Sequence, residues 1–138
     1  MILSAEEFRR LRTSTESAEY LRAAVEDAPI DVWREVIASM PDMREWVARN
    51  KTVPIEILEI LAHDESSNVR SVVAGKRKLP ENIQLVLGRD VAADVRHSLA
   101  WNAKATKRVI ELLALDSEGY IRDQAIKRLQ TVPDHAIP

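Results

Sequence analysis

The stretch VRSVVAGKRKLPE, residues 69–81, places a Val-Arg pair before small apolar residues, a cluster of basic residues and a proline. The same order of residue types recurs along the chain. An arginine that follows an apolar residue occurs four times at intervals of 26 residues: Arg44, Arg70, Arg96 and Arg122. Such periodicity is typical of proteins built from stacked structural repeats. The sequence therefore predicts several copies of one unit.

Other positions recur in register with the arginines. Alanine, leucine and aspartate follow them at fixed distances: Ala48, Ala74 and Ala100; Leu61, Leu87 and Leu113; Asp64, Asp90 and Asp116. Pro54 and Pro80 also match, and Thr106 stands in their place in the next unit. A degenerate copy lies upstream in residues 21–43 if one residue is omitted. Several columns in one register make chance agreement a poor explanation.

Each unit is predicted to contain two helices. The first begins at the proline, whose missing N–H is tolerated in a first helical turn, and includes PIEILEIL or PENIQLVL. The second is predicted over residues 67–75, 93–101 and 119–129, with Asn68, Asp94 and Ser117 as N-caps. Neither helix can bury its apolar face alone, so neighbouring units must stack.

The pattern V-R-x-x-V-A-x-N-x-x-x-P-x-x-x-L-x-x-L-A-x-D resembles the leucine-rich repeat variant family, a relative of HEAT and armadillo solenoids. It is most complete in MREWVARNKTVPIEILEILAHD, residues 43–64, and covers residues 43–129. The chain departs from the pattern at Lys76, where Asn is usual, and at Thr106, where Pro is usual. Such solenoids mostly bind proteins and sometimes nucleic acid. Some members carry an iron–sulfur cluster on a cysteine-bearing segment, and this cysteine-free chain gives no ground for that feature.

The expected fold class is all-α: a right-handed α-solenoid of HEAT-like two-helix repeats with a 26-residue period and an N-terminal helical cap. A single domain would span residues 1–138. Residues 1–42 would form the cap and a degenerate repeat, residues 43–130 three to four repeats, and residues 131–138 a loose tail. Ser4 and Glu7 have the spacing of a capping box before the first helix.

The repeated arginines and aspartates favour a structural role over an anion-binding site, because a single site does not need repetition. Asp64 precedes Arg70 by six residues, across the turn between two helices. A carboxylate there can pair with a guanidinium of its own unit or of the next one.

The second helices carry apolar residues on the face opposite their packed stripe. At about 100° per residue, the positions one, two and five residues after each arginine lie away from the stripe. They include Trp46 and Arg49, Val72, and His97 with Trp101. By analogy with HEAT-like solenoids these residues line a concave surface, where an exposed Trp contributes strongly to binding. The alternative is that each ring packs over a neighbouring helix. Trp33, in DVWREVI, is assigned to the core.

The loops separate by charge. Basic residues follow the second helices: Arg49 and Lys51; Lys76, Arg77 and Lys78; Lys104, Lys107 and Arg108. Acidic residues lie at the opposite edge: Asp64 and Glu65; Asp90 and Asp94; Asp116 and Glu118. Helices pack about 8–10 Å apart, so each set would form a row. Solvation alone can account for charged loops; the alternative is a basic rim that meets an acidic partner or a phosphate backbone.

The favoured function is a non-catalytic scaffold that binds a protein partner, in one form as a small bacterial inhibitor or immunity protein. The predicted contact residues are Trp46, Arg49, Val72, Lys76, Arg77, Lys78, His97, Trp101 and Lys104. The alternative is a nucleic-acid-binding HEAT-like protein with a groove like that of certain alkylpurine DNA glycosylases.

No catalytic, cofactor-binding or metal-binding set is expected. The three histidines lack a spacing such as H-x-x-x-H. The formal net charge of -2 gives no overall attraction to nucleic acid or membranes. No apolar run is long enough to span a bilayer, and the N-terminus does not read as a signal peptide. We therefore expect a cytoplasmic protein, monomeric or weakly oligomeric, without a membrane segment.

Overall fold

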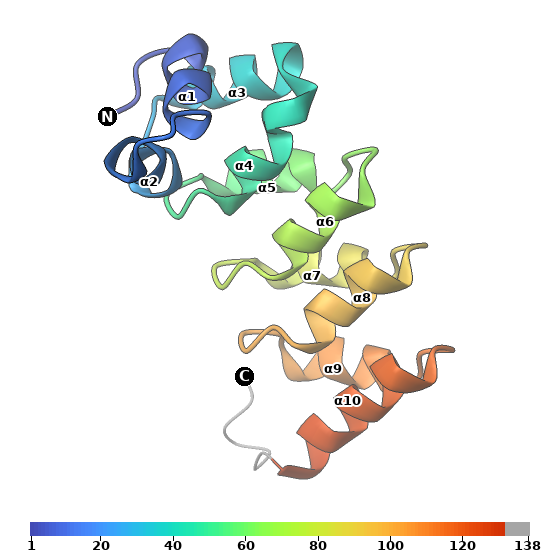
Figure 1. The fold of residues 1–138 in the computed structure, drawn as a ribbon. Coiled ribbons are helices and arrows are strands. Elements are labelled where there is room, and N and C mark those ends of the chain that lie inside the picture. The colour runs from blue at the N-terminus through green and yellow to red at the C-terminus, as the bar shows by residue number, and fades with distance from the viewer. Residues whose placement is uncertain (132–138) are drawn as a thin grey trace. The chain divides into compact units, whose positions relative to one another are not determined.

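All regular structure in the computed structural model is helical, within the described residues 1–131 (Figure 1). These residues form helices α1 to α10 and one short 3-10 helix, and they contain no strand. The predicted all-α class is therefore confirmed. The chain packs as two compact units, Met1–Leu61 and Ala62–Pro138, which are described separately below as unit 1 and unit 2. Of the predicted loose tail, only residue 131 lies within the described residues.

Unit 1 contains five α-helices: α1 (Ala5–Arg12), α2 (Ser17–Val25), α3 (Ile30–Ser39), α4 (Arg44–Arg49) and α5 (Ile55–Leu61), with the 3-10 helix Pro41–Met43 before α4. The predicted capping box is present, because Ser4 Oγ accepts a hydrogen bond from the Glu7 N–H at 3.0 Å. The Glu7 carboxylate accepts the reciprocal bond from Leu3 at 2.9 Å, one residue earlier than the usual geometry. Trp33 is fully buried against Phe8, with the ring centroids 5.3 Å apart, as predicted for a core residue.

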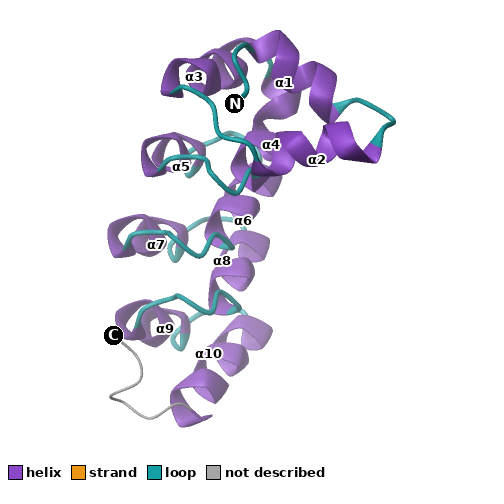
Figure 2. Cartoon of the chain, turned by 90° about the vertical axis from the view of Figure 1, so that its left-hand side faces the viewer, coloured by secondary structure: helices purple, strands orange, loops and turns teal. Residues whose placement is uncertain are grey.

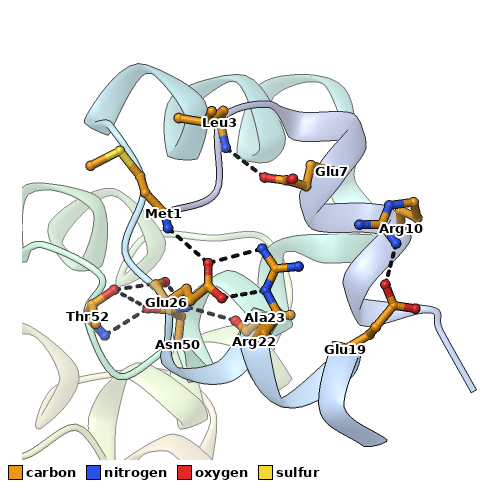
Figure 3. Close-up of polar contacts among 10 residues, drawn as sticks. All are labelled: Met1, Leu3, Glu7, Arg10, Glu19, Arg22, Ala23, Glu26, Asn50 and Thr52. Carbon is orange, nitrogen blue, oxygen red and sulfur yellow. Dashed lines mark hydrogen bonds and ion pairs between the residues drawn. The ribbon is translucent and has the colours of Figure 1, made fainter. Parts of the chain in front are cut away.

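Polar side chains of unit 1 tie the end of α2 to the loop after α4 (Figure 3). Asn50 Nδ2 donates to the carbonyl oxygens of Ala23 and Glu26 at 2.8 and 2.9 Å. The Glu26 side chain pairs with Arg22 and, at 3.0 Å, with the amino group of Met1. The hydrogen bonds from Arg22 and then from the amino group lower the pKa of Glu26 to about 2.

Unit 2 contains α6 (Ser67–Ala74), α7 (Glu81–Leu87), α8 (Ala93–Ala100), α9 (Lys107–Leu113) and α10 (Gly119–Thr131). Figure 2 shows α6, α8 and α10 in one row and α7 and α9 in another. Neighbours within each row pack against one another, α6 against α8, α8 against α10 and α7 against α9. The three helices of the first row closely match the ranges predicted for the second helix of each unit. The first helices begin just after Pro54 and Pro80 rather than at the prolines themselves.

The core of unit 2 consists of apolar side chains from both rows. Val73, Leu87, Leu99 and Leu113 have no solvent-exposed surface. The helices approach closely at Gly88, where a Cβ atom would lie 3.0 Å from Cδ2 of Leu112. A side chain at this position would displace that neighbour, so the packing favours glycine here.

Two arginine–aspartate pairs with the same geometry connect successive helices of unit 2. Arg70 donates from Nε and Nη2 to the Asp90 carboxylate, at 2.8 and 3.1 Å, and from Nη1 to the Asp64 carbonyl at 2.8 Å. Arg96 makes the same three bonds 26 residues later, to the Asp116 carboxylate at 2.8 and 3.2 Å and to the Asp90 carbonyl at 2.7 Å. Each arginine therefore uses its own aspartate through the backbone and the following one through the side chain.

The same aspartates also order the turns before the second helices. One carboxylate oxygen accepts from the backbone N–H two residues later: Asp64 from Ser66, Asp90 from Ala92 and Asp116 from Glu118, at 2.9–3.0 Å. These are Asx turns, in which the side chain replaces a backbone acceptor. The prediction of Asn68, Asp94 and Ser117 as N-caps was wrong. The N-cap residues of α6 and α8 are Ser66 and Ala92, so Asn68 and Asp94 lie inside these helices.

A second recurring contact joins the other ends of α6, α8 and α10. Asn102 Nδ2 donates to the carbonyl oxygens of Ala74 and Lys76 at 2.8 and 2.9 Å. Arg128, 26 residues later, donates from Nη1 to the corresponding carbonyls of Ala100 and Asn102 at 2.9 and 2.8 Å. These carbonyls end the preceding helix and lack an intrahelical donor. The same column includes Asn50, which bonds equivalent carbonyls in unit 1.

Thr106 departs from the repeat pattern with a structural consequence. Its N–H, which a proline would lack, donates to Oε1 of the buried Gln84 at 3.1 Å. Gln84 Nε2 bonds the carbonyl oxygens of Leu79 and Lys104 at 2.7 and 3.2 Å. Thr106 Oγ1 also accepts from the Val109 N–H at 3.4 Å and caps α9. The Thr106 N–H thus satisfies the buried Gln84 side chain with a hydrogen bond that a proline at position 106 could not donate.

We predict an acid dependence of stability that runs through the arginine–aspartate pairs. Burial disfavours the charged carboxylate, but Arg96 and the Glu118 N–H outweigh it, so the net pKa of Asp116 is lowered. A group with a lowered folded-state pKa stabilises the fold above its unfolded value, near pH 4, and loses this contribution as the pH falls through the folded value. Denaturant unfolding of Asp116→Asn should therefore show lower stability than wild type at pH 7. The difference should shrink between about pH 4 and pH 2. A constant difference over that range would contradict this role.

Candidate partner-binding surface

Trp101 is a large aromatic residue held in place on the surface. It is the C-cap residue of α8, and 64% of its surface is exposed. Its indole N–H donates to Nε2 of His97, one helical turn earlier, at 2.9 Å. This bond requires His97 Nε2 to be an unprotonated acceptor. The ring is thus oriented without being buried.

His97 also contacts Tyr120 of α10. The two rings meet edge to face with centroids 4.9 Å apart, and Tyr120 is 51% exposed. His97, Trp101 and Tyr120 form an aromatic cluster that spans two neighbouring helices. The sequence analysis omitted Tyr120, although its position two residues before Arg122 has the same helical phase as Trp101. Extending the phase count upstream of each arginine would have found it.

Val72 lies in the same row of helices as the aromatic cluster, on α6. Its side chain is half-buried. Gly75 follows α6 at the position that corresponds to Trp101, and a Cβ atom there would meet only carbonyl oxygens of its own turn. The surface beside Trp101 is therefore open on the α6 side. Unit 2 places the predicted contact residues Val72, His97 and Trp101 on or at the end of two neighbouring helices of this row, α6 and α8.

Trp46 lies in unit 1, on α4, and differs from Trp101. The guanidinium carbon of Arg12 lies 3.5 Å from its ring centroid, and that of Arg49 lies 5.6 Å away. Arg12 therefore covers one face of the ring in a cation–π contact. Arg49 also pairs with Glu45 at 3.2 Å. Both predicted residues are thus engaged within unit 1, and Trp46 is half-buried rather than open.

Four of the basic residues predicted for the rim of unit 2 lie in two loops on the same side of the unit: Lys76, Arg77, Lys78 and Lys104. The loops that follow α6 and α8 lie at the left of Figure 1. Arg77, Lys78 and Lys104 are exposed, and within residues 1–131 none forms an ion pair. Lys76 is half-buried, and Arg108 is paired with Glu81 at 3.0 Å. We call Arg77, Lys78 and Lys104 the basic loop residues.

Of the acidic residues predicted at the opposite edge, some are paired with arginines and others are exposed. Asp90 and Asp116 are consumed by the arginine pairs, with side chains 9% and 6% exposed. Asp94 is exposed and accepts a hydrogen bond from Ser71 at 3.4 Å. These two aspartates therefore serve the predicted arginine pairs and add little exposed charge to this edge.

The described part of the chain offers no clustered donors for a metal ion. Within residues 1–131, no group of three His, Asp or Glu side chains is placed to bind one. The same residues include no helix long and apolar enough to cross a membrane. The exposed aromatic cluster and the basic loop residues are therefore the features of unit 2 from which we argue function.

Compared with known proteins, the chain matches no family model, no curated protein and no solved structure.

We predict that two tryptophan substitutions change the stability by very different amounts. Trp101→Ala should change the free energy of unfolding by less than about 1 kcal/mol, since the ring is mostly exposed. Trp33→Ala should lower it by about 3–5 kcal/mol, because the buried ring leaves a cavity. Denaturant titrations followed by circular dichroism measure both. A loss for Trp101→Ala as large as that for Trp33→Ala would show that Trp101 serves packing.

Proposed function

We propose that this chain is a non-catalytic α-solenoid that binds an acidic protein partner through the aromatic cluster and the basic loop residues of unit 2. The proposed architecture is a right-handed stack of HEAT-like two-helix repeats with a 26-residue period over residues 43–130. The recurring Arg–Asp pairs and the recurring bonds of Asn102 and Arg128 support this periodicity. In one form of this function, the chain occludes the active site of its target, as an inhibitor or immunity protein does.

The observation that carries the proposal is the exposed but oriented ring of Trp101. An exposed indole leaves a large apolar surface in water, and burial of such a ring contributes strongly to binding. The hydrogen bond to His97 and the packing of His97 on Tyr120 restrict the ring before a partner arrives. Less conformational entropy is then lost on binding.

The charges around the cluster favour an acidic partner. Arg77, Lys78 and Lys104 have no carboxylate partner within the described residues, and Lys127 on α10 is also exposed and unpaired there. Lys127 corresponds to Trp101 in the 26-residue register. Rim charges of one sign accelerate association with an oppositely charged surface more than they raise affinity. Trp101 would thus supply binding energy, and the basic loop residues would supply selectivity and rate.

A protein partner is favoured over nucleic acid by the number of available aromatic faces. Binding of single-stranded nucleic acid uses successive exposed rings on which bases stack. Unit 2 presents two exposed rings, Trp101 and Tyr120, with His97 in contact with both, and in unit 1 Arg12 covers a face of Trp46. The net charge of -2 also lacks the basic excess typical of nucleic-acid-binding domains.

The proposal is tested by affinity capture from nuclease-treated lysate of the source organism, followed by quantitative binding of the captured protein. Trp101→Ala should weaken binding by at least about 30-fold, which is the level of a hot-spot residue. Reversing the charges of Arg77 and Lys78 to glutamate should mainly slow association and weaken its salt dependence. Val91→Ala is the matched control, because Val91 is an almost fully exposed apolar residue in the turn before α8.

Equal loss for Trp101→Ala and Val91→Ala would contradict a specific role for the aromatic cluster. Capture that disappears after nuclease treatment would instead support the nucleic-acid alternative. Retained binding by Trp101→Ala, with wild-type stability, would exclude this surface as the binding site.

A further inference from the structure

Arg122 is the third arginine of the series in unit 2, and its bonding differs from that of the first two. Arg70 and Arg96 each use Nε and Nη2 on an aspartate carboxylate twenty residues later. Arg122 makes the corresponding Nη1 bond, to the Asp116 carbonyl at 3.0 Å. Within residues 1–131, no carboxylate reaches its Nε or Nη2.

The free side of this guanidinium is oriented in advance. The bond to the Asp116 carbonyl fixes one nitrogen, and the ideal Cβ position of Gly119 lies 3.5 Å from Nη2. The side chain is half-buried at the beginning of α10. A planar guanidinium with two adjacent free donors matches the two oxygens of one carboxylate. Arg122 therefore shares the Nη1 bond of Arg70 and Arg96 but lacks their carboxylate partner within residues 1–131.

Apolar residues near Arg122 are uncovered at positions that are buried in the preceding helices. Ile126 is 37% exposed, whereas Ala74 and Ala100, at the equivalent positions of α6 and α8, have no exposed surface. Ala114 is half-buried, whereas the equivalent Gly88 is buried beneath Leu112. The face around α9 and α10 thus combines an apolar floor with an unfilled pair of donors.

We propose that this face is a second binding site, which takes an aspartate or glutamate that directly follows an apolar helix of a protein partner. The chemistry is set by the two filled sites in the same unit. Asp90 follows α7 and Asp116 follows α9, and each presents its carboxylate to an arginine while the helix before it packs on the unit. A partner helix that is followed by such a carboxylate would pair with Arg122 and would cover Ile126 in the same contact. The site is separate from the aromatic cluster, so it stands or falls independently of the proposed function.

A free phosphate would match the guanidinium but not its surroundings. Ile126 and Ala114 offer no hydrogen-bond donor from their side chains, and covering them releases apolar surface from water. A helix followed by a carboxylate meets both requirements. The ligand is therefore assigned as an acidic protein segment, and inorganic phosphate serves as a control.

The test uses the full chain labelled with 15N and a synthetic peptide with the sequence of residues 107–118, KRVIELLALDSE, blocked at both ends. This peptide contains the helix and the carboxylate that fill the site of Arg96. The Nε–H signals of Arg70 and Arg96 serve as internal references, because their donors are already occupied. The Arg122 Nε–H should exchange faster with water than these two. It should shift and become protected when the peptide is added.

Two matched changes isolate the carboxylate. The peptide with Asp116→Asn should bind at least about tenfold more weakly, and so should the wild-type peptide on the Arg122→Gln chain, because charge-assisted bonds are lost in both. Arg89→Gln is the control variant, since Arg89 is exposed and its side chain bonds only the Leu85 carbonyl of the preceding helix α7 within the described residues. It should leave the affinity unchanged.

Equal affinities of the Asp and Asn peptides would overturn the assignment, as would no change at Arg122 with millimolar peptide. A shift at Arg122 with phosphate alone, at lower concentration than with peptide, would also overturn it. The last seven residues include Asp134, so a chain ending at Thr131 is compared with the full chain. Binding at least tenfold tighter to the shorter chain would assign the site to the protein's own tail and contradict the partner.

Discussion

The arrangement of unit 2 depends on the ion pair between the guanidinium of Arg96 and the carboxylate of Asp116. Three of the hydrogen bonds of this guanidinium join the turn before α8 to the turn before α10, since they reach the Asp90 carbonyl and the Asp116 carboxylate. The two side chains are only 13% and 6% exposed, so both charges are largely removed from water. A poorly paired charge in this environment would destabilise the fold. Here the bidentate geometry and the additional bond from the Glu118 N–H satisfy the carboxylate.

A second contact fixes the opposite ends of the same helices. Asn102 bonds the last carbonyls of α6, and Arg128 bonds those of α8. Burial lowers the pKa of Arg128, which nevertheless remains protonated at neutral pH. With both ends of α6, α8 and α10 held, the exposed residues along these helices take fixed positions relative to one another. The contact of His97 with Tyr120, and the orientation of Trp101, follow from that spacing.

The sequence predicted the helices and the residues that connect them better than it predicted the partner of each residue. The 26-residue columns identified Arg70, Arg96, Asp90 and Asp116 as structural, and the buried pairs agree with that interpretation. Spacing alone could not say which aspartate receives the side chain, because its own unit and the next one were both within reach. Tyr120 was missed because the phase count was run only downstream of each arginine. Arg128 was missed for another reason. Arg128 replaces an asparagine in its column, and only three-dimensional contact reveals that both residues donate to the same kind of carbonyl.

The central claim is that the Arg96–Asp116 pair stabilises unit 2 as a pair, and a double-mutant cycle tests it most directly. The free energies of unfolding of wild type, Arg96→Gln, Asp116→Asn and the double variant are measured in denaturant at pH 7. Because two charge-assisted bonds join the side chains in a largely buried site, the coupling energy should be about 1.5–3 kcal/mol. A coupling energy below about 0.5 kcal/mol, as measured for many exposed ion pairs, would contradict the claim.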